Sequence, residues 1–354
     1  MTNSPAAEPS RRLAEVDALR GVAALAVVLF HFTTRFLELY APSAASAATV
    51  GAPSFTVPHG HYGVNLFFII SGFVIFMTLD RTQRGMDFVV SRFSRLFPAY
   101  WVAVVVTFAV TSTFGLPGKE VTLVQALANL FMIHGLFYVP HVDGVYWTLE
   151  VELLFYTGMF LLFMRGKLQR VYWAMAALLG LRLTYHVAQL AWGVDLPWTL
   201  YRLTILKFIP WFALGIFVYQ TAINPSRAGG RAARLVALLS LACLWVVDGW
   251  PLALLALALA GLVWGAARGH LPWLANPVLG FFGAISYTLY LLHENIGWVV
   301  QRAVQANGGS FDASIAAAFV VTVLLSTALT YAVEKPAMRW VRNQYRQRSA
   351  KPEA

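Results

Sequence analysis

Several ionisable side chains in this sequence fall inside long apolar segments. Arg20 and His31 lie in LRGVAALAVVLFH, Glu152 lies in WTLEVELLFY, and His293 ends ISYTLYLLH. An ionisable group within a membrane span costs about 2.5–3.5 kcal/mol on insertion scales, so each is a candidate functional residue. A histidine beside a carboxylate suits general-base catalysis, because the carboxylate fixes the tautomer of the imidazole.

The spacing of Arg20 and His31 places both on one face of a helix. The eleven-residue step between them exceeds three helical turns by roughly 20° and covers about 16 Å along the axis. Arg20 is then expected at the cytoplasmic end and His31 in the outer half. The structural alternatives are a snorkelling anchor for Arg20 and a satisfied core histidine for His31.

The predicted depth of Glu152, about two turns inside its segment, is close to that of His31. A carboxylate at this depth requires a histidine or arginine partner, so we expect Glu152 to orient His31. An ion pair that only ties helices together is the alternative.

Polar side chains in two further segments are expected to support these groups. Ser286, Tyr290 and His293 follow the i, i+4, i+7 spacing of one helix face, and Tyr287 lies beside them. Asn65 and Ser71 lie in GVNLFFIISGF, where Gly72 allows close helix approach. Interhelical hydrogen bonding and packing are the structural alternatives.

A second cluster is expected at the cytoplasmic face. Arg92 and Arg95 in SRFSRLFPAYW gather there with Arg20 and Glu334. Arginines at a membrane edge suit phosphate groups. Coenzyme A, with its phosphate-rich head and long arm ending in a reactive group, fits both clusters.

The elements that position these residues are predicted to be membrane-spanning helices. Hydrophobic residues make up 59% of the 354-residue chain and charged residues 12%, about half the charge of a soluble domain. The apolar residues fall in runs near the length that crosses a bilayer. We expect about ten spans: 17–39, 61–79, one from Phe97 with Pro98 in its first turn, 146–164, 171–191, 204–220, 235–247, 251–267, 278–299 and 313–333. The apolar stretch 123–133 is too short to span and is expected to be interfacial or re-entrant.

Lysine and arginine alternate between loops, as the positive-inside rule requires, and predict that both termini are cytoplasmic. This pattern explains the net charge of +10 without nucleic-acid binding. The predicted organisation is a disordered N-terminus (1–12), one all-α transmembrane domain (13–340) and a basic cytoplasmic tail (341–354). Cys243, the single cysteine, excludes a disulfide within the chain and a cysteine-based metal site.

Six segments together resemble the acyltransferase 3 family of membrane O-acyltransferases, and they occur in family order from about Asp17 to Arg339. They are the five quoted above for Arg20–His31, Asn65, Arg92–Arg95, Glu152 and His293, and the terminal EKP. The resemblance implies acyl transfer from acyl-CoA to a hydroxyl, often on a surface polysaccharide or lipopolysaccharide. It implies a catalytic His31, with Arg20 as its signature partner and Glu152 as the motif carboxylate.

The sequence departs from the family pattern at two positions. Asn65 stands where the family usually has Asp, so it is given only a supporting role, and Thr148 replaces the usual Ser.

The resulting hypothesis is an acetyltransferase of the bacterial inner membrane. The nucleotide of acetyl-CoA docks on Arg92, Arg95 and Arg20, and His31 deprotonates a hydroxyl of a glycan or glycolipid acceptor. An acyl-histidine intermediate stays open. Partners would be the bilayer, the acceptor and possible polysaccharide assembly proteins; no metal is expected.

Three rival functions remain at this point. The first is a transporter or flippase for the glycan or its acyl group. The second is a non-enzymatic scaffold of a polysaccharide assembly complex. The third is a metal enzyme that uses His59, His61, His134 and His141, although these lack clear ligand spacing.

Overall fold

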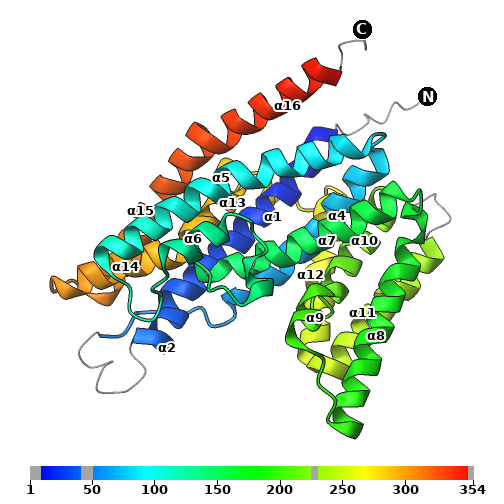
Figure 1. Cartoon of the computed structure of the whole chain (residues 1–354), viewed down its shortest axis with the longest axis horizontal. Coiled ribbons are helices and arrows are strands. Elements are labelled where there is room, and N and C mark those ends of the chain that lie inside the picture. The colour runs from blue at the N-terminus through cyan, green and yellow to red at the C-terminus, as the bar shows by residue number, and fades with distance from the viewer. Residues whose placement is uncertain (1–8, 41–50, 225–229, 350–354) are drawn as a thin grey trace. The chain divides into compact units, whose positions relative to one another are not determined.

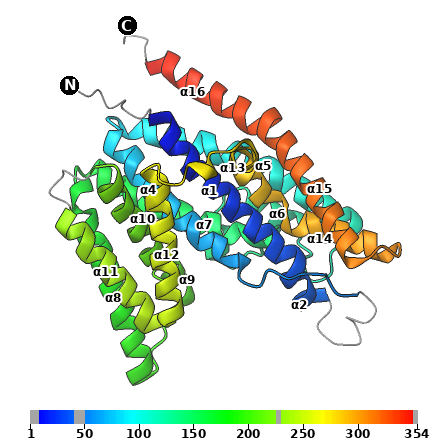
Figure 2. The same ribbon diagram turned by 180° about the vertical axis from the view of Figure 1, so that it is seen from behind.

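A computed structural model describes residues 9–40, 51–224 and 230–349. Within these ranges the chain is helical and contains no β-strand (Figures 1 and 2). The α-helices are α1 (Pro9–Leu29), α2 (Phe36–Tyr40), α4 (Gly63–Arg81), α5 (Gly85–Phe114), α6 (Leu123–Asn129), α7 (Trp147–Met164), α8 (Val171–Trp192), α9 (Trp198–Leu203), α10 (Ile209–Ala222), α11 (Gly230–Asp248), α12 (Trp250–Ala267), α13 (Pro277–Leu292), α14 (Glu294–Ala306), α15 (Phe311–Leu329) and α16 (Lys335–Ser349).

The described part of the chain contains 7 helical segments that are long and apolar enough to cross a membrane. Two further apolar helices, α10 and α13, are shorter, and α8 is not among the seven. The predicted all-α integral membrane fold is confirmed, whereas the cytoplasmic position of both termini stays a prediction. The seven segments are Ala14–Tyr40, Gly60–Arg81, Gly85–Phe114, Gly144–Met164, Gly230–Asp248, Trp250–Ala267 and Phe311–Arg348.

Several predicted spans have different bounds in the structure, and the third and the ninth differ in ways that bear on the site. The third begins at Gly85, so Pro98 lies inside α5 and not in its first turn, and Arg92 and Arg95 are helical. A proline removes one helical hydrogen bond, but buried residues on both sides of it, such as Leu96 and Tyr100, hold the helix together by packing. The ninth predicted span is two helices, α13 and α14, that meet at His293.

The ends of the chain also differ in part from the prediction. Residues 1–8 of the predicted disordered N-terminus lie outside the described residues, and Pro9–Arg12 form the start of α1. The last predicted span continues from α15 through a π-helical turn, Thr330–Glu334, into α16. Residues 350–354 of the predicted tail lie outside the described residues.

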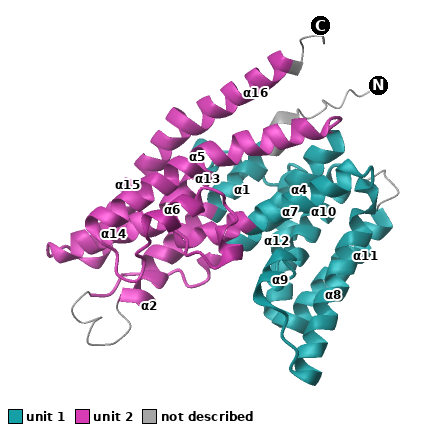
Figure 3. Ribbon diagram, in the orientation of Figure 1, with its two compact units in different colours: residues 1–23, 64–81, 151–284 teal, residues 24–63, 82–150, 285–354 magenta. Residues whose placement is uncertain are grey.

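The chain divides into two compact units (Figure 3). Unit 1 comprises residues 1–23, 64–81 and 151–284, and unit 2 comprises residues 24–63, 82–150 and 285–354. Helices α1, α7 and α13, and α4 through its first residue, contribute residues to both units.

Unit 1 is held together by close packing of α4 on α10. A Cβ added at Gly72 would collide with the carbonyl oxygen of Phe212, and one added at Gly215 would collide with that of Ile69. The expectation that Gly72 allows close helix approach is therefore confirmed. Phe155 of α7 stacks on Phe212 with ring centroids 4.0 Å apart.

Unit 2 packs α14 against α15 and α5, and α16 against α5. Tyr100 of α5 donates a hydrogen bond to the carbonyl of Asn129 (2.7 Å), which fixes α6 beside α5. Thr122 and Gln125 form a capping box at the start of α6. These contacts position the loops that carry Lys119 and Asp143.

Candidate active site

His31 lies in a π-helical turn, Phe30–Arg35, that interrupts the helical segment between α1 and α2. Such turns widen a helix by one residue and occur frequently at functional sites. The indole nitrogen of Trp298 on α14 donates to the backbone carbonyl of His31 (3.0 Å). The imidazole itself is 13% exposed. Trp298 therefore fixes the backbone at His31, while the imidazole remains partly exposed.

A second histidine fixes the tautomer of His31. Nδ1 of the buried His293 lies 2.9 Å from the carbonyl oxygen of Tyr290 and 3.1 Å from that of Leu289. A carbonyl only accepts, so Nδ1 of His293 carries the proton and its Nε2 is an acceptor. Nδ1 of His31 lies 3.1 Å from that Nε2.

The backbone requires the same tautomer of His31. Its Nδ1 lies 2.9 Å from the carbonyl oxygen of Val27, which also needs a donor. Neutral His31 is thus assigned a proton on Nδ1, and its Nε2 is left with a lone pair. An imidazole in this state can accept a proton at Nε2.

The carboxylate beside this nitrogen belongs to Glu294, the first residue of α14. Its Oε2 lies 3.4 Å from Nε2 of His31, and its Oε1 lies 3.2 Å from Nζ of Lys119. Glu294 is 6% exposed. A partly desolvated carboxylate in this position stabilises the imidazolium that forms when Nε2 takes a proton.

Lys119 and Gly144 shape the surroundings of Glu294. The ammonium of Lys119 lies 5.0 Å from the ring centroid of Trp298, a cation–π contact. A Cβ added at Gly144 would collide with the Glu294 carboxylate. The loop before α7 therefore approaches Glu294 closely only because residue 144 has no side chain.

Asp143 holds the start of α14 in place. It is fully buried, and it accepts hydrogen bonds from the backbone N–H groups of Asn295 (3.1 Å) and Val145 (3.2 Å). Asn295 in turn donates to the carbonyl of Val142 (2.8 Å). Burial, together with the negative charge of Glu294, raises the pKa of Asp143 well above its usual value. Through the hydrogen bond that it accepts from the backbone of Asn295, Asp143 fixes the first turn of α14 and so orients Glu294.

Glu152 belongs to unit 1, where it accepts a hydrogen bond from Ser71 (2.7 Å) and another from Tyr156. The predicted supporting residue Ser71 thus contacts the predicted carboxylate. The predicted orientation of His31 by Glu152 stays a prediction, since His31 belongs to unit 2.

Arg20 and Asn65 also belong to unit 1. Arg20 lies 3.7 Å from Asp17, one turn earlier on α1. Asn65 is half-buried in the first turn of α4.

The supporting residues of α13 belong to unit 2. The Tyr290 hydroxyl lies 2.8 Å from that of Thr148, so Thr148 pairs with the residue that fixes His293. Tyr287 donates to the carbonyl of Leu96 on α5 (2.8 Å). Ser286 is fully buried.

The arginines on α5 have different partners. Arg95 forms an ion pair with Glu334, which is 1% exposed, and its guanidinium lies 5.8 Å from the ring centroid of Tyr287. Arg92 donates to Ser91 (3.3 Å). Arg92, Arg95 and Glu334 all belong to unit 2, and Arg95 contacts Glu334 directly; their gathering at the cytoplasmic face stays a prediction.

The sequence reasoning did not identify Glu294, Lys119 and Asp143. Glu294 directly follows His293, so an ionisable pair at the end of an apolar segment was visible. Lys119 is the single lysine or arginine in the segment 115–145, which was expected to be external. An isolated basic residue in such a segment is a signal for a carboxylate partner.

The four histidines of the metal hypothesis, His59, His61, His134 and His141, do not form a metal site in the described residues. Nε2 of His134 lies 2.6 Å from Nδ1 of His141. Across the described ranges, no group of three or more His, Cys, Asp or Glu is placed to hold a metal ion.

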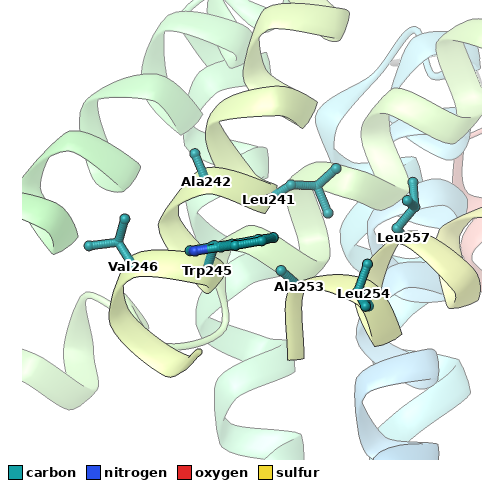
Figure 4. A pocket seen from close by; sticks show the side chains of 7 residues that line it. All are labelled: Leu241, Ala242, Trp245, Val246, Ala253, Leu254 and Leu257. Atoms are coloured by element: carbon teal, nitrogen blue, oxygen red, sulfur yellow. The ribbon is translucent and has the colours of Figure 1, made fainter. Parts of the chain in front are cut away.

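An apolar groove of about 490 Å³ lies between α11 and α12 in unit 1 (Figure 4). Its lining side chains are all apolar, so it offers no group for acid–base chemistry. They are Leu241, Ala242, Trp245, Val246, Ala253, Leu254 and Leu257.

Comparison with known proteins agrees with the sequence motifs. Residues 13–333 match a family described as an acyltransferase domain. The exopolysaccharide production protein ExoZ of Rhizobium meliloti (strain 1021) is 30% identical over 298 residues, which cover 79% of this chain and 90% of that protein. No solved structure matches the chain significantly. The chain is therefore a multi-pass membrane protein that belongs to the acyltransferase 3 family.

Proposed function

We propose that this protein is an O-acyltransferase that moves an acyl group, acetyl in the first instance, from acyl-CoA to a hydroxyl of a cell-surface or exported glycan. The observation that carries the proposal is the contact of His31 with Glu294 and His293. The family supplies the reaction class. The glycan acceptor is supported by the similarity to a protein of exopolysaccharide production. A bacterial inner membrane is the corresponding location.

In the proposed reaction, Nε2 of His31 removes the proton of the acceptor hydroxyl. The oxygen attacks the thioester carbonyl, the carbon–sulfur bond breaks, and the thiolate of CoA leaves. The thiolate then takes the proton from the imidazolium. A base positioned in this way contributes typically 10²–10⁴-fold to the rate. Glu294 stabilises the imidazolium between the two proton transfers.

Arg92 and Arg95 are the proposed docking site for the phosphates of acyl-CoA. Guanidinium groups bind phosphate oxygens in a planar, bidentate geometry. The α5 helix that carries them also carries Leu96, whose carbonyl accepts a hydrogen bond from Tyr287 on α13, the helix that ends beside His293. The added contribution of Arg20, from unit 1, stays a prediction. Proteins of polysaccharide assembly are candidate partners.

The proposal is tested by label transfer from radiolabelled acetyl-CoA in membranes that contain the host glycan lipids. Wild type, His31→Ala and His270→Ala are compared at equal abundance; His270 is exposed and belongs to unit 1. Transfer by wild type and His270→Ala, with loss in His31→Ala, is expected.

Two other results contradict the proposal in different ways. Equal transfer by His31→Ala removes His31 as the base. Glycan movement across the membrane without acetyl-CoA consumption favours a transporter.

A further inference from the structure

Two arginine side chains from different helices converge on one hydroxyl group in unit 2. Arg92 of α5 and Arg342 of α16 both donate to Oγ of Ser91, at 3.3 Å and 3.4 Å. Arg342 also reaches the carbonyl of Ser91 (3.5 Å) and Oγ of Ser94 (3.3 Å). A residue of the C-terminal helix thus joins the arginines of α5.

Among the residues that the structure describes, no carboxylate pairs with the positive charge of Arg92 or Arg342. In the described ranges no carboxylate lies within 4.0 Å of Arg92 or Arg342, whereas Arg95 is paired with Glu334. Arg95 and Arg346 add to the positive charge near Arg342. Nε of Arg92 is buried and has no hydrogen-bond partner. Like charges this close repel each other, so a bound anion would stabilise the arrangement.

We propose that Arg92 and Arg342, with the hydroxyls of Ser91 and Ser94, bind a phosphate group. Phosphate offers tetrahedral oxygens, which suit donors arriving from two helices, and its charge matches two unpaired guanidiniums. The identification of this phosphate with one of acyl-CoA rests on the proposed function. The phosphate of an anionic lipid headgroup has the same chemistry.

The division of roles among the arginines follows from their partners. Arg95 is paired with Glu334 and adds its positive charge to the docking site, whereas Arg92 and Arg342 have no carboxylate partner among the described residues and bind the phosphate directly. Arg342 is thus a phosphate ligand contributed from beyond the EKP segment, and α16 closes one side of the site.

The test uses the full chain in nanodiscs of phosphatidylcholine, with binding of acetyl-CoA and of acetyl-pantetheine, which lacks phosphate, measured by equilibrium dialysis. The variants are Arg342→Gln, Arg342→Lys and the control Arg348→Gln, which lies on the same helix and is exposed. We expect Arg342→Gln to weaken acetyl-CoA binding about 10- to 100-fold, Arg342→Lys to weaken it less, and neither to alter acetyl-pantetheine binding.

A second arm measures thermal stabilisation by phosphatidylglycerol nanodiscs. Stabilisation that is lost in Arg342→Gln, with acetyl-CoA affinity unchanged, supports the site and assigns it to a lipid phosphate. Equal behaviour of Arg342→Gln and Arg348→Gln in both arms overturns the proposal. If wild type binds acetyl-CoA through Arg342 but transfers nothing to glycan, the phosphate site stands and the proposed function fails.

Discussion

Nε2 of His31 and Oε2 of Glu294 lie 3.4 Å apart. The two residues are distant in the sequence, because Glu294 directly follows His293, which lies 262 positions after His31. The contact brings a carboxylate to the nitrogen that hydrogen bonding leaves unprotonated. In a partly buried setting the attraction between this carboxylate and a protonated His31 is stronger than it would be in water. Glu294 is therefore the carboxylate whose loss should affect the proposed proton transfer most.

Replacement of Glu294 by Gln is expected to lower kcat by about 10²-fold. The amide has the same shape and can still contact Lys119, but it cannot neutralise a protonated His31. The measurement is acetyl transfer per folded molecule. Glu38→Gln is the matched control, because Glu38 is half exposed and pairs with Arg35 on its own helical segment. A full rate in Glu294→Gln contradicts the role assigned to Glu294.

The sequence predicted His31 and His293 as site residues. It did not predict Glu294, the carboxylate that contacts both His31 and Lys119. His31 was recognisable because an ionisable residue in an apolar segment is costly. Glu294 was not predicted as a site residue, because residues 278–299 were expected to form one continuous span. In the structure α13 ends at Leu292 and α14 begins at Glu294. Pairing across long sequence separation depends on tertiary packing, which helical periodicity does not contain.

Lys119 and Glu294 are expected to be energetically coupled. Lys119→Met removes the ammonium that holds Oε1 of Glu294 at 3.2 Å, so the carboxylate is no longer fixed beside His31 and kcat should fall. Once Glu294 is Gln, the same lysine change should have a smaller effect. A double-mutant cycle on kcat measures this, with a coupling of about 0.5–3 kcal/mol expected for groups in one network. Additive effects would show that Lys119 acts independently of Glu294.

Gly144→Ala should impair activity through the position of Glu294. The added Cβ meets the carboxylate, which must move away from His31. Gly158→Ala on α7 is the matched control, since a Cβ there meets nothing within 4 Å. Acetyl transfer is compared with the thermal midpoint of each purified variant. We expect reduced transfer in Gly144→Ala alone; equal activity of the two variants would mean that Glu294 tolerates displacement.

The fold was more predictable than the site, for reasons visible in particular elements. Runs of apolar residues located α7 and α12 to within one residue at each end. The start of α5 was predicted wrongly at Phe97, because proline is common in the first turn of a helix. In the structure α5 continues through Pro98, since the buried residues on both sides of it are packed. The π-helical turn at His31 could not be predicted from the residue pattern. Such a turn adds one residue to a helical turn, and tertiary packing decides where it forms.

Arg182 and Asp248 join α8 to α11 in unit 1 and provide a test of stability independent of the chemistry. Nη2 of Arg182 donates to both carboxylate oxygens of Asp248, at 2.8 Å and 2.6 Å, and the two side chains are 3% and 18% exposed. Removal of one partner of a buried pair leaves a charge without compensation, at a cost of about 3–5 kcal/mol.

Arg182→Met should therefore lower the thermal midpoint of the purified protein in detergent. The double variant Arg182→Met/Asp248→Leu should recover much of the loss, because apolar replacement of both partners removes the buried charge. Acetyl transfer per folded molecule should remain near wild type in both, since neither residue belongs to the unit that holds His31 and Glu294. A double variant less stable than Arg182→Met would mean that Asp248 stabilises the α11–α12 turn by contacts other than this pair.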